Sequence, residues 1–280
     1  IIIPTYNRAN TIKRCIDSIV KQTYQEFEII IIDDNSNDNT KEIVKLICDD
    51  RVKYIRNNIN KGANESRNIG VANAIGEYIA FQDSDDEWLE NKLEIQIKEL
   101  IKSEADIVAS SFYRYEDENM EIIPNIKISD DDIPSMLMFG NFISTQTILG
   151  KRECFKKEKF DSDFPRFQDW ELLLRMSKSY KIHFINKPLA NVYVQEDSIS
   201  KNSDKAIIAL KMIINKYYNE LLSNKKAMAS MYEKLAHWSR KINDFSENYY
   251  KEALKFDRTN IKLIIKLIIF EIIKIKKYFK

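Results

Sequence analysis

Short apolar runs and stripes with helical spacing alternate along the first 110 residues. Runs such as Phe27–Ile32 and Tyr78–Phe81 are almost wholly apolar, which is typical of strands buried on both faces. Between the runs, apolar residues such as Ile12, Ile16 and Ile19 recur three or four positions apart, which predicts helices. This alternation favours an α/β fold with a mostly parallel twisted sheet flanked by helices. The predicted strands cover residues 1–3, 27–32, 52–55, 78–81 and 106–110, and the predicted helices cover residues 12–20, 43–47, 66–74 and 93–101.

The pattern is less regular after residue 112 and becomes helical from Lys205 onward. The stretch 232–260 resembles a single tetratricopeptide-type hairpin, without a repeat array. We therefore expect an α/β domain over residues 1–204 and a C-terminal helical region over residues 205–280. In the irregular part we predict a loop at 117–135, a strand at 141–150, a helix at 168–179, strands at 183–185 and 190–194, and a mobile segment at 196–204.

Composition and missing motifs narrow the function classes. The formal net charge is +1, so nothing attracts the chain as a whole to nucleic acid, and we expect no nucleic-acid partner. There is no signal peptide, and Cys15, Cys48 and Cys154 form no zinc spacing, which favours reduced thiols in a cytoplasmic protein. The chain opens inside an apolar run, so the sequence is expected to start within a first strand. Neither a serine-hydrolase elbow nor a glycine-rich phosphate loop is recognisable.

Three polar clusters each follow a predicted strand directly. In a parallel sheet, ligands bind beyond the carboxyl ends of the strands, and these ends lie at one edge. We therefore expect the three clusters to meet at one edge of the sheet. The clusters are Thr5–Arg8, Asp33–Ser36 and Asp83–Asp86.

The third cluster places the carboxylates of Asp83, Asp85 and Asp86 within four residues, where they repel one another. A divalent cation would neutralise them. Oxygen ligands suit Mg²⁺ or Mn²⁺, which commonly bind a few carboxylates together with substrate phosphates. The same residues could instead form a solvated turn that caps the next helix. The residues alone leave both interpretations open.

Three other charged residues also allow two interpretations. Asp34 could accept hydrogen bonds from a base or a ribose, or it could cap a helix. Arg67 lies near the start of a predicted helix, where a cation opposes the helix dipole, so it could contact a nucleotide or simply pair with an acidic neighbour. Asp169 also begins a helix, and in that position it needs no function.

Five strings in this order and spacing resemble glycosyltransferase family 2, the inverting enzymes of the GT-A fold. The resemblance covers roughly residues 1–200. It implies a nucleotide-diphospho-sugar transferase, with UDP as the favoured nucleotide and Mn²⁺ or Mg²⁺ as the cofactor. It also implies a glycan or lipid-linked acceptor in bacterial polysaccharide synthesis, with a hexose or an N-acetylhexosamine as the transferred sugar. The strings are Ile2–Arg8, Ile32–Thr40, Gly62–Gly70, Gly76–Trp88 and Gln168–Arg175.

The resemblance also implies roles for single residues. Asp169 would be the general base that takes the proton of the acceptor hydroxyl. Asp85 would bind the metal against the donor diphosphate, with Asp83 in support, whereas Asp86 is expected to be structural. The nucleotide-sugar pocket would contain Pro4, Thr5, Tyr6, Arg8, Asp34, Arg67, Asp83 and Ser84.

Two departures from the family pattern leave an alternative open. Gln168 stands where the family often has Glu, and Gln195–Glu196 stand where basic residues often hold the diphosphate, although Lys201 could substitute. A non-catalytic sugar-nucleotide-binding or scaffold protein with a degenerate site is therefore the alternative hypothesis. A sugar nucleotidyltransferase would need a glycine-rich and basic N-terminal loop, which Pro4–Arg8 does not supply.

The C-terminal stretch 261–280 combines many Ile and Leu residues with six lysines, and it resembles an amphipathic helix. Lys266 and Glu271 interrupt the apolar run, which excludes a transmembrane span. Two interpretations remain. The helix could lie on an anionic membrane surface, which would place the protein at the inner face of the cell membrane. It could instead pack on the domain or on a second protomer in a homodimer.

Overall fold

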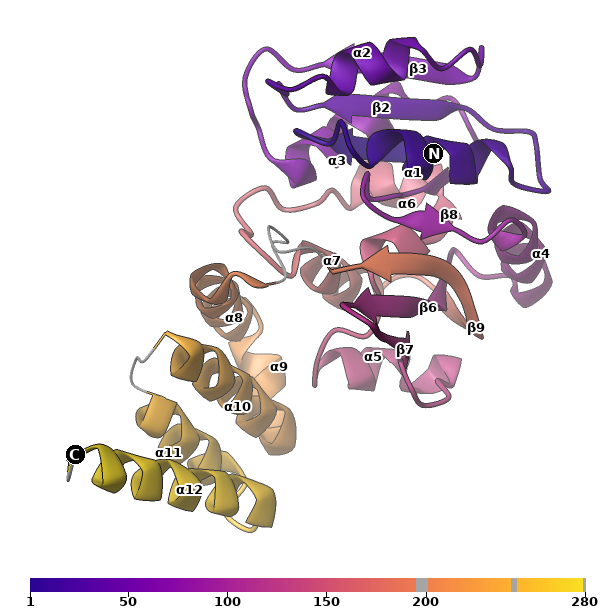
Figure 1. Ribbon diagram of the computed structural model, residues 1–280. Coiled ribbons are helices and arrows are strands. Elements are labelled where there is room, and N and C mark those ends of the chain that lie inside the picture. The colour runs from indigo at the N-terminus through magenta and orange to yellow at the C-terminus, as the bar shows by residue number, and fades with distance from the viewer. Residues whose placement is uncertain (195–200, 243–245, 279–280) are drawn as a thin grey trace. The chain divides into compact units, whose positions relative to one another are not determined.

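The computed structural model describes residues 1–194, 201–242 and 246–278 (Figure 1). The chain divides into two compact units, and each is described by itself. Unit 1 comprises Ile1–Pro134, Asn141–Asp163 and Gln168–Gln195, and unit 2 comprises Ser135–Gly140, Phe164–Phe167 and Glu196–Lys280.

A three-stranded parallel sheet forms the N-terminal part of unit 1, in the order β1-β2-β3 (Figure 1). The register pairs Ile2 with Ile30 and Ile29 with Val52. The predicted alternation of strands and helices is confirmed over this part. The elements are β1 (Ile2–Thr5), α1 (Ile12–Val20), β2 (Ile29–Asp33), α2 (Thr40–Lys45), β3 (Val52–Arg56) and α3 (Ala63–Asn73).

A second sheet of unit 1 has the order β4-β8-β6-β9-β5, with β7 paired to β6. Only β6 and β9 run parallel in it, whereas its other pairs are antiparallel. The α/β fold is thus confirmed, but this sheet is mixed rather than mostly parallel. Its strands are β4 (Tyr78–Ala80), β5 (Glu87–Trp88), β6 (Ile107–Glu116), β7 (Asn119–Ile123), β8 (Leu149–Lys151) and β9 (Ile182–Tyr193), and the helices between them are α4 (Lys92–Ser103), α5 (Ile133–Leu137), α6 (Arg152–Lys157) and α7 (Gln168–Met176).

Three predictions for the irregular middle of the chain were wrong in part. The loop predicted at 117–135 contains β7, a 3-10 turn (Asp130–Asp132) and α5, because residues 119–123 pair with β6 as a hairpin. The strand predicted at 141–150 is a strand only at Leu149–Lys151 and holds a 3-10 turn at Thr145–Thr147. The two short strands predicted around Pro188 are one strand, β9, whose register with β6 shifts near Ser111.

The core of unit 1 explains why these runs fold as strands. Ile29 to Ile32 are fully buried, so helices cover β2 on both faces. On one face, α3 approaches β1 closely, since a Cβ atom built on Gly70 would lie 2.4 Å from a side-chain carbon of Ile2. Glycine permits this approach because it has no side chain. The close contact packs α3 directly on β1.

Unit 2 contains helices over most of its described length. Its tightest contact is between α10 and α11, which form the hairpin predicted from 232–260. The mobile segment predicted at 196–204 lies largely outside the described residues, and α8 begins at Ser203. The helices are α8 (Ser203–Lys216), α9 (Tyr218–Ser223), α10 (Lys225–Lys241), α11 (Ser246–Phe256) and α12 (Ile261–Tyr278).

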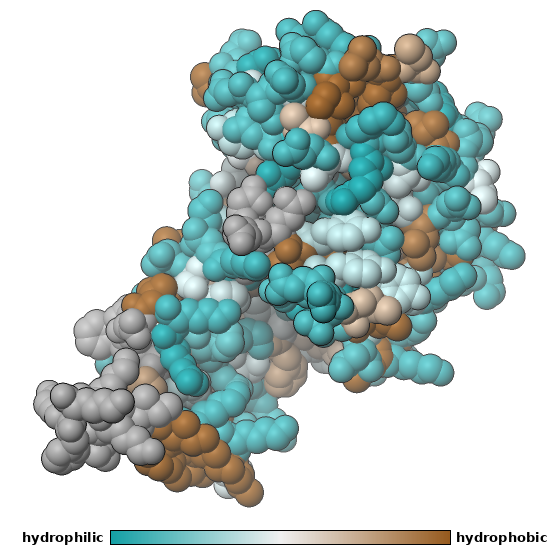
Figure 2. Space-filling model, in the orientation of Figure 1, coloured by the Kyte–Doolittle hydropathy of each residue, from teal (hydrophilic) through white to brown (hydrophobic). Residues whose placement is uncertain are grey.

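Among the side chains of α12 that the structure describes, Leu263 and Leu267 pack on the neighbouring helices. Leu263 is buried in a cluster with Ala236, Tyr250 and Ala253. Much of the remaining surface is apolar and exposed, and it forms part of the brown surface at the lower end of the molecule in Figure 2. Among the described residues, no helix is both long and apolar enough to cross a bilayer. The exposed isoleucines of α12 are Ile261, Ile264, Ile265, Ile268, Ile269 and Ile272.

Candidate functional site

The loops that follow β1 and β2 are bonded to each other at the carboxyl edge of the sheet. The Asp34 N–H donates to the Thr5 carbonyl at 2.8 Å, and the Asn7 N–H donates to the Ser36 hydroxyl at 2.9 Å. The Asn37 N–H in turn donates to the Asn7 side-chain oxygen at 2.8 Å. Asn7 has a φ of 52°, a left-handed conformation that Asn tolerates better than most residues. The first two polar clusters therefore meet, as the sequence predicts.

The first loop also reaches the acidic cluster. The Arg8 N–H donates to the Thr40 hydroxyl at 2.9 Å at the start of α2, and an Arg8 side-chain nitrogen lies 3.6 Å from an Asp85 carboxylate oxygen. Pro4 and Thr5 are buried at the end of β1, whereas Tyr6 is 43% exposed. Of the predicted pocket residues in this loop, Arg8 thus lies beside the acidic cluster.

The two neighbouring acids Asp33 and Asp34 have different surroundings. Asp33 is buried and accepts hydrogen bonds from the Ser36 N–H at 2.8 Å and from the Tyr54 hydroxyl. Burial and this bond to Asp33 raise the pKa of Tyr54. These contacts hold the turn after β2. Asp33 is therefore structural.

Asp34 holds the loop that leads into α3. Its carboxylate accepts hydrogen bonds from the N–H groups of Lys61 and Gly62, at 2.8 and 2.7 Å, and from the Asn57 amide at 2.8 Å. Gly62 has a φ of +87°, which glycine adopts without strain. Asp34 thereby connects the end of β2 to the helix that carries Arg67. Neither of the functions proposed from the sequence, nucleotide contact or helix capping, anticipated this contact.

Arg67 and Asp83 form a partly buried ion pair. The Arg67 Nη2 donates to Asp83 Oδ1 at 2.7 Å, and the arginine side chain is 4% exposed. In the described part of the chain, no acceptor lies within hydrogen-bond distance of Arg67 Nε or Nη1. A buried guanidinium with two unbonded nitrogens is unusual, because buried polar groups are normally satisfied. The ion-pair interpretation of Arg67 is correct, but it accounts for only one of three nitrogens.

The last acid of the cluster, Asp86, is structural in its contacts. It is buried, its Oδ1 accepts from the Tyr193 N–H at 2.9 Å, and its Oδ2 accepts from the Gln146 amide at 2.7 Å. Burial, together with the neighbouring charges of Asp85 and Asp83, raises the pKa of Asp86 well above its ordinary value. Asp86 therefore joins the acidic loop to the end of β9.

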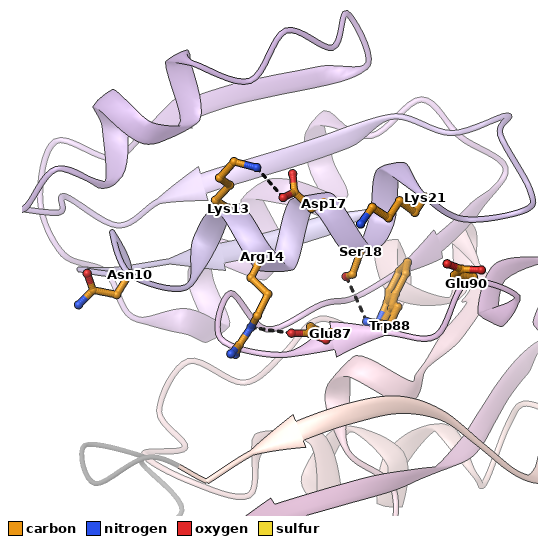
Figure 3. A pocket seen from close by; sticks show the side chains of 9 residues that line it. All are labelled: Asn10, Lys13, Arg14, Asp17, Ser18, Lys21, Glu87, Trp88 and Glu90. Carbon is orange, nitrogen blue, oxygen red and sulfur yellow. Dashed lines mark hydrogen bonds and ion pairs between the residues drawn. The ribbon is translucent and has the colours of Figure 1, made fainter.

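Arg14 supports the acidic loop, a role that no sequence motif predicts. Its Nη2 donates to the Asp85 carbonyl at 2.5 Å, its Nε lies 2.8 Å from Glu87, and its guanidinium lies 4.3 Å from the centre of the Tyr193 ring. Arg14 also lines a groove of about 550 Å³ between α1 and β5, where Figure 3 shows its contact with Glu87. No sequence signal links α1 to residues 85–87, because helical spacing alone does not reveal what a polar face contacts.

Asp169 lies at the first turn of α7, partly buried, and it accepts a hydrogen bond from the Trp170 N–H at 2.8 Å. Burial raises the pKa of Asp169. The Trp170 N–H, the positive charge of Arg67 and a hydrogen bond from Asn141 act against this shift, and the charge of Asp83 adds to it. The charges of Arg67 and Asp83 thus both affect the pKa of Asp169. Residues 67 and 83 are far from residue 169 in the sequence and come near it only in the folded chain.

The chemistry of Asp83 and Asp85 fits a divalent metal that shares its coordination with a substrate. Among the residues that the structure describes, no group of three acidic, His or Cys side chains could hold a metal alone. Mg²⁺ and Mn²⁺ often bind one or two carboxylates and complete their shells with phosphate oxygens and water. The Asp85 side chain is partly exposed, at 19%, and the Asp83 side chain at 30%. Ser84, between them, is buried.

Comparison with known protein families identifies the family to which this chain belongs. Residues 1–168 match Glycosyl transferase family 2. The chain belongs to glycosyltransferase family 2. Over 213 residues it is 36% identical to the Escherichia coli UDP-Glc:alpha-D-GlcNAc-diphosphoundecaprenol beta-1,3-glucosyltransferase WfaP, an alignment that covers 74% of this chain and 82% of that protein. The similar enzyme WfgD of Escherichia coli is 33% identical over 210 residues, covering 74% of this chain and 81% of WfgD.

Other relatives of this family 2 glycosyltransferase are longer. An uncharacterized glycosyltransferase of Rickettsia conorii is 29% identical over 267 residues, or 93% of this chain, but the match spans only 44% of that relative. In a Rickettsia bellii relative the match spans 29% of the length. The chain therefore covers less than half of these two relatives.

Solved structures confirm the GT-A fold. S. aureus TarS 1-349 in complex with UDP-GlcNAc superposes with a TM-score of 0.64 at 16% identity, covering 95% of this chain and 88% of that one. The mannosyltransferase PcManGT from Pyrobaculum calidifontis, in complex with GDP-Man and Mn²⁺, gives a TM-score of 0.54 at 17% identity, with 91% and 72% covered. At these identities the likeness establishes the fold alone.

Proposed function

We propose that this family 2 glycosyltransferase is an inverting enzyme that moves a sugar from a UDP-sugar to a hydroxyl of a glycan or lipid-linked acceptor. The observation that carries the proposal is the Arg67–Asp83 ion pair, which places a buried cation 2.7 Å from the acidic loop in the unit that also carries Asp169. Burial also raises the pKa of the Asp169 carboxylate. An inverting transfer needs this combination, because proton removal and departure of the diphosphate occur in one step.

The proposed donor is a UDP-hexose or a UDP-N-acetylhexosamine. The names of WfgD and WfaP specify UDP-Glc, and a TarS structure contains UDP-GlcNAc. In our proposal the donor contacts the loops at the carboxyl edge of the sheet, where they are bonded to one another. The proposed contact residues are Pro4, Thr5, Tyr6, Arg8, Asp34, Arg67, Asp83 and Ser84.

The proposed cofactor is Mn²⁺ or Mg²⁺, held by Asp85 with help from Asp83. Bound there, the ion would neutralise negative charge on the departing nucleoside diphosphate. Asp86 is excluded from this role because Gln146 and the Tyr193 N–H already bind its two oxygens. Arg14 positions the loop through the Asp85 carbonyl.

Asp169 is the proposed general base. An acceptor hydroxyl is a weak nucleophile, so a carboxylate must take its proton during attack. Attack from the face opposite the diphosphate inverts the anomeric centre without a covalent intermediate, so one carboxylate is enough. Inverting glycosidases place their base on the opposite face in the same way. Burial raises the pKa of Asp169 above its ordinary value, which makes the carboxylate a stronger base.

The proposed acceptor is a lipid-linked glycan, reached from the inner face of the cell membrane. The names of WfgD and WfaP specify a GlcNAc-diphosphoundecaprenol acceptor. Helix α12 exposes a stripe of isoleucines and also carries lysines, including the exposed Lys262 and Lys266. An apolar stripe flanked by lysines matches a helix that lies on an anionic membrane. A homodimer through the same helix is the competing interpretation.

The test is transfer from UDP-Glc and UDP-GlcNAc, with Mn²⁺, to a synthetic α-GlcNAc-diphosphate lipid. We expect release of UDP and a product whose new linkage is β, as NMR coupling constants of the anomeric proton would reveal. An α linkage from these α-linked donors would contradict inversion. Tight UDP binding without turnover, across a broad panel of donors and acceptors, would instead favour the non-catalytic alternative. The departure at Gln195–Glu196 that motivated this alternative lies outside the described residues.

A further inference from the structure

Two asparagines one turn apart on α3 hold a distant segment of the chain. The Asn68 amide donates to the Phe160 carbonyl at 2.9 Å, and its oxygen accepts from the Phe160 N–H at 3.0 Å. The Asn64 amide donates to the Asp161 carbonyl at 2.9 Å. Residues four apart lie on the same helix face, so both asparagines point at the segment that follows α6. Asn68 thus satisfies both polar backbone groups of one residue 92 positions away.

This arrangement fixes the Phe160 ring beside Arg67. The Phe160 ring centre lies 5.3 Å from the Arg67 guanidinium carbon, and the ring is buried. The ring also meets Phe81 edge to face, with centroids 5.2 Å apart and an interplanar angle of 87°. Phe160 is therefore held through its backbone by Asn68 and through its side chain by Phe81. It has little freedom to follow Arg67 if the arginine moves.

The aromatic neighbour of Arg67 leaves the hydrogen-bond donors of the guanidinium available. A cation beside a ring is stabilised without giving up any N–H donor, whereas a carboxylate or carbonyl neighbour would occupy donors. In Arg67 only Nη2 is bonded, to Asp83, and in the described part of the chain Nε and Nη1 have no acceptor. The ring thus stabilises the charge and leaves two donors available in a site where a ligand with many oxygens is expected.

We propose that Asn68 is a positioning residue for donor binding, acting through Phe160 on Arg67. In this inference, the free nitrogens of Arg67 bind carbonyl or phosphate oxygens of the nucleotide donor, and Asn68 keeps the ring in the place that leaves them free. The inference rests on the proposed function, since it assumes a nucleotide-sugar at this site. It assigns no contact between Asn68 and the donor.

The chemistry of a carboxamide explains why Asn is needed at position 68. Only an amide offers a donor and an acceptor to the two backbone groups of Phe160 at once. Aspartate would lose the donor, and its charge would face the Phe160 carbonyl. It would also stand beside Glu65, whose carboxylate lies 3.4 Å from the Asn68 amide nitrogen. A new carboxylate here could in addition attract the free nitrogens of Arg67.

The test compares Asn68→Asp with wild type and with a matched control. Asn73→Asp changes the same residue type on the same helix, but Asn73 is exposed, and its amide donates within α3 to the Ile69 carbonyl at 2.8 Å. With Mn²⁺ present, we expect Asn68→Asp to weaken UDP binding about tenfold by calorimetry, the scale of a lost cation–π arrangement, and Asn73→Asp to leave it unchanged. At saturating donor, kcat should change by less than about threefold, because the base and the acidic loop are intact.

Two further measurements separate positioning from a general loss of structure. Phe160→Leu retains an apolar side chain but removes the ring, so it should raise the UDP dissociation constant as Asn68→Asp does. Combined with Arg67→Lys, Asn68→Asp should add little further loss, since both changes act on one group. If Asn68→Asp does not fold, as judged by circular dichroism, the UDP affinity of Phe160→Leu alone decides the test.

Equal UDP affinity of wild type and a folded Asn68→Asp, or of wild type and Phe160→Leu where Asn68→Asp does not fold, would overturn the inference. The inference would also be overturned if the losses of UDP affinity in Arg67→Lys and in Asn68→Asp multiplied in the double variant. An absence of UDP binding by the wild type would instead reject the proposed function, so the two failures are distinguishable.

Discussion

The loops at the carboxyl edge of the parallel sheet in unit 1 and the helices α10–α12 of unit 2 are held together by different kinds of contact. In the loops, buried polar groups are satisfied by residues far away in the sequence, as when the Asp86 carboxylate accepts from the Tyr193 N–H, 107 positions on. In the helices, neighbours in sequence pack together through residues such as Ala253 and Leu263. Helices α10–α12 leave isoleucines exposed, whereas beside the loops, at the start of α3, two nitrogens of Arg67 have no acceptor among the described residues. The two regions therefore differ in the kind of surface they present, polar in the first and apolar in the second.

The largest expected effect lies in the loop region. Asp169→Asn should lower kcat by about 10²–10⁴-fold, equivalent to roughly 3–5 kcal/mol of barrier, because the amide cannot take a proton. UDP affinity should stay within about threefold of wild type. The exposed Asp131→Asn is the control and should leave kcat unchanged. Equal turnover by Asp169→Asn and wild type, measured as UDP release, would remove Asp169 from the mechanism.

The second-largest expected effect tests how helix α12 packs within unit 2. Leu263→Ala should lower the free energy of unfolding of unit 2 by about 2–4 kcal/mol, since it opens a cavity in the cluster around Tyr250. Ile268→Ala, five residues on and 52% exposed, should cost less than about 0.5 kcal/mol. Urea denaturation followed by circular dichroism measures both. Similar losses for the two variants would mean that the stripe is covered in solution.

The third effect concerns the packing that places α3 at the site. Gly70→Ala should destabilise unit 1 by about 1–2 kcal/mol, because the added methyl group meets Ile2 and the resulting strain exceeds the gain in helix propensity. Asn73→Ala is the control, because it keeps a Cβ on the exposed side of α3 and removes only a side-chain amide that bonds within the helix. A Gly70→Ala variant as stable as wild type would contradict the close contact between β1 and α3.

A smaller effect tests the membrane interpretation of α12. Lys262→Gln should weaken binding to vesicles that contain anionic lipid by about fivefold, or roughly 1 kcal/mol for one lysine, and added salt should reduce the difference. Lys225→Gln, on α10, is the exposed control. Co-sedimentation with anionic and with neutral vesicles measures both. No binding of wild type to either kind of vesicle, together with a dimer in light scattering, would favour the homodimer.

The smallest expected effect is a displaced pH profile. Burial raises the pKa of Asp169 above the ordinary 3.8. A general base works only when deprotonated, so kcat/KM should fall as the pH drops through this raised pKa, and the fall should begin at a higher pH than for an exposed aspartate. Measurement of kcat/KM between pH 4 and 8 tests the sign. An acid limb at or below the ordinary value would argue against a partly buried base.

Much of the fold followed from apolar periodicity, and the departures have a common cause. Residues 119–123 form a strand because they pair with β6, although Met120 and Ile122 are exposed and their side chains give no core pattern. The mixed second sheet could not be predicted because periodicity reports burial, not strand direction. The strand at residues 119–123 and the strand directions of the second sheet both depend on which segments pair in the folded chain.

The same limit applies to the site. Asp34, Asp83 and Asp85 could be found because they stand directly after strands, where the chain must present them at one edge, whereas Asp169 was indicated only by the family resemblance. Arg14, Gln146 and Asn68 could not be found, since each lies within a helix or a turn and acts on a residue at least 60 positions away. The identity of such a side chain matters only after folding has supplied its partner.

The sequence by itself determined the α/β order of the first 110 residues, the three polar clusters and the helical C-terminal region, because hydrophobic spacing and strand ends are local properties of a chain. Only the tertiary structure decided which backbone groups the acids hold and that, among the described residues, two nitrogens of Arg67 have no acceptor beside Phe160. These facts depend on burial and on hydrogen-bond partners. Both arise from segments that are distant in the sequence and adjacent in space, so no local pattern contains them.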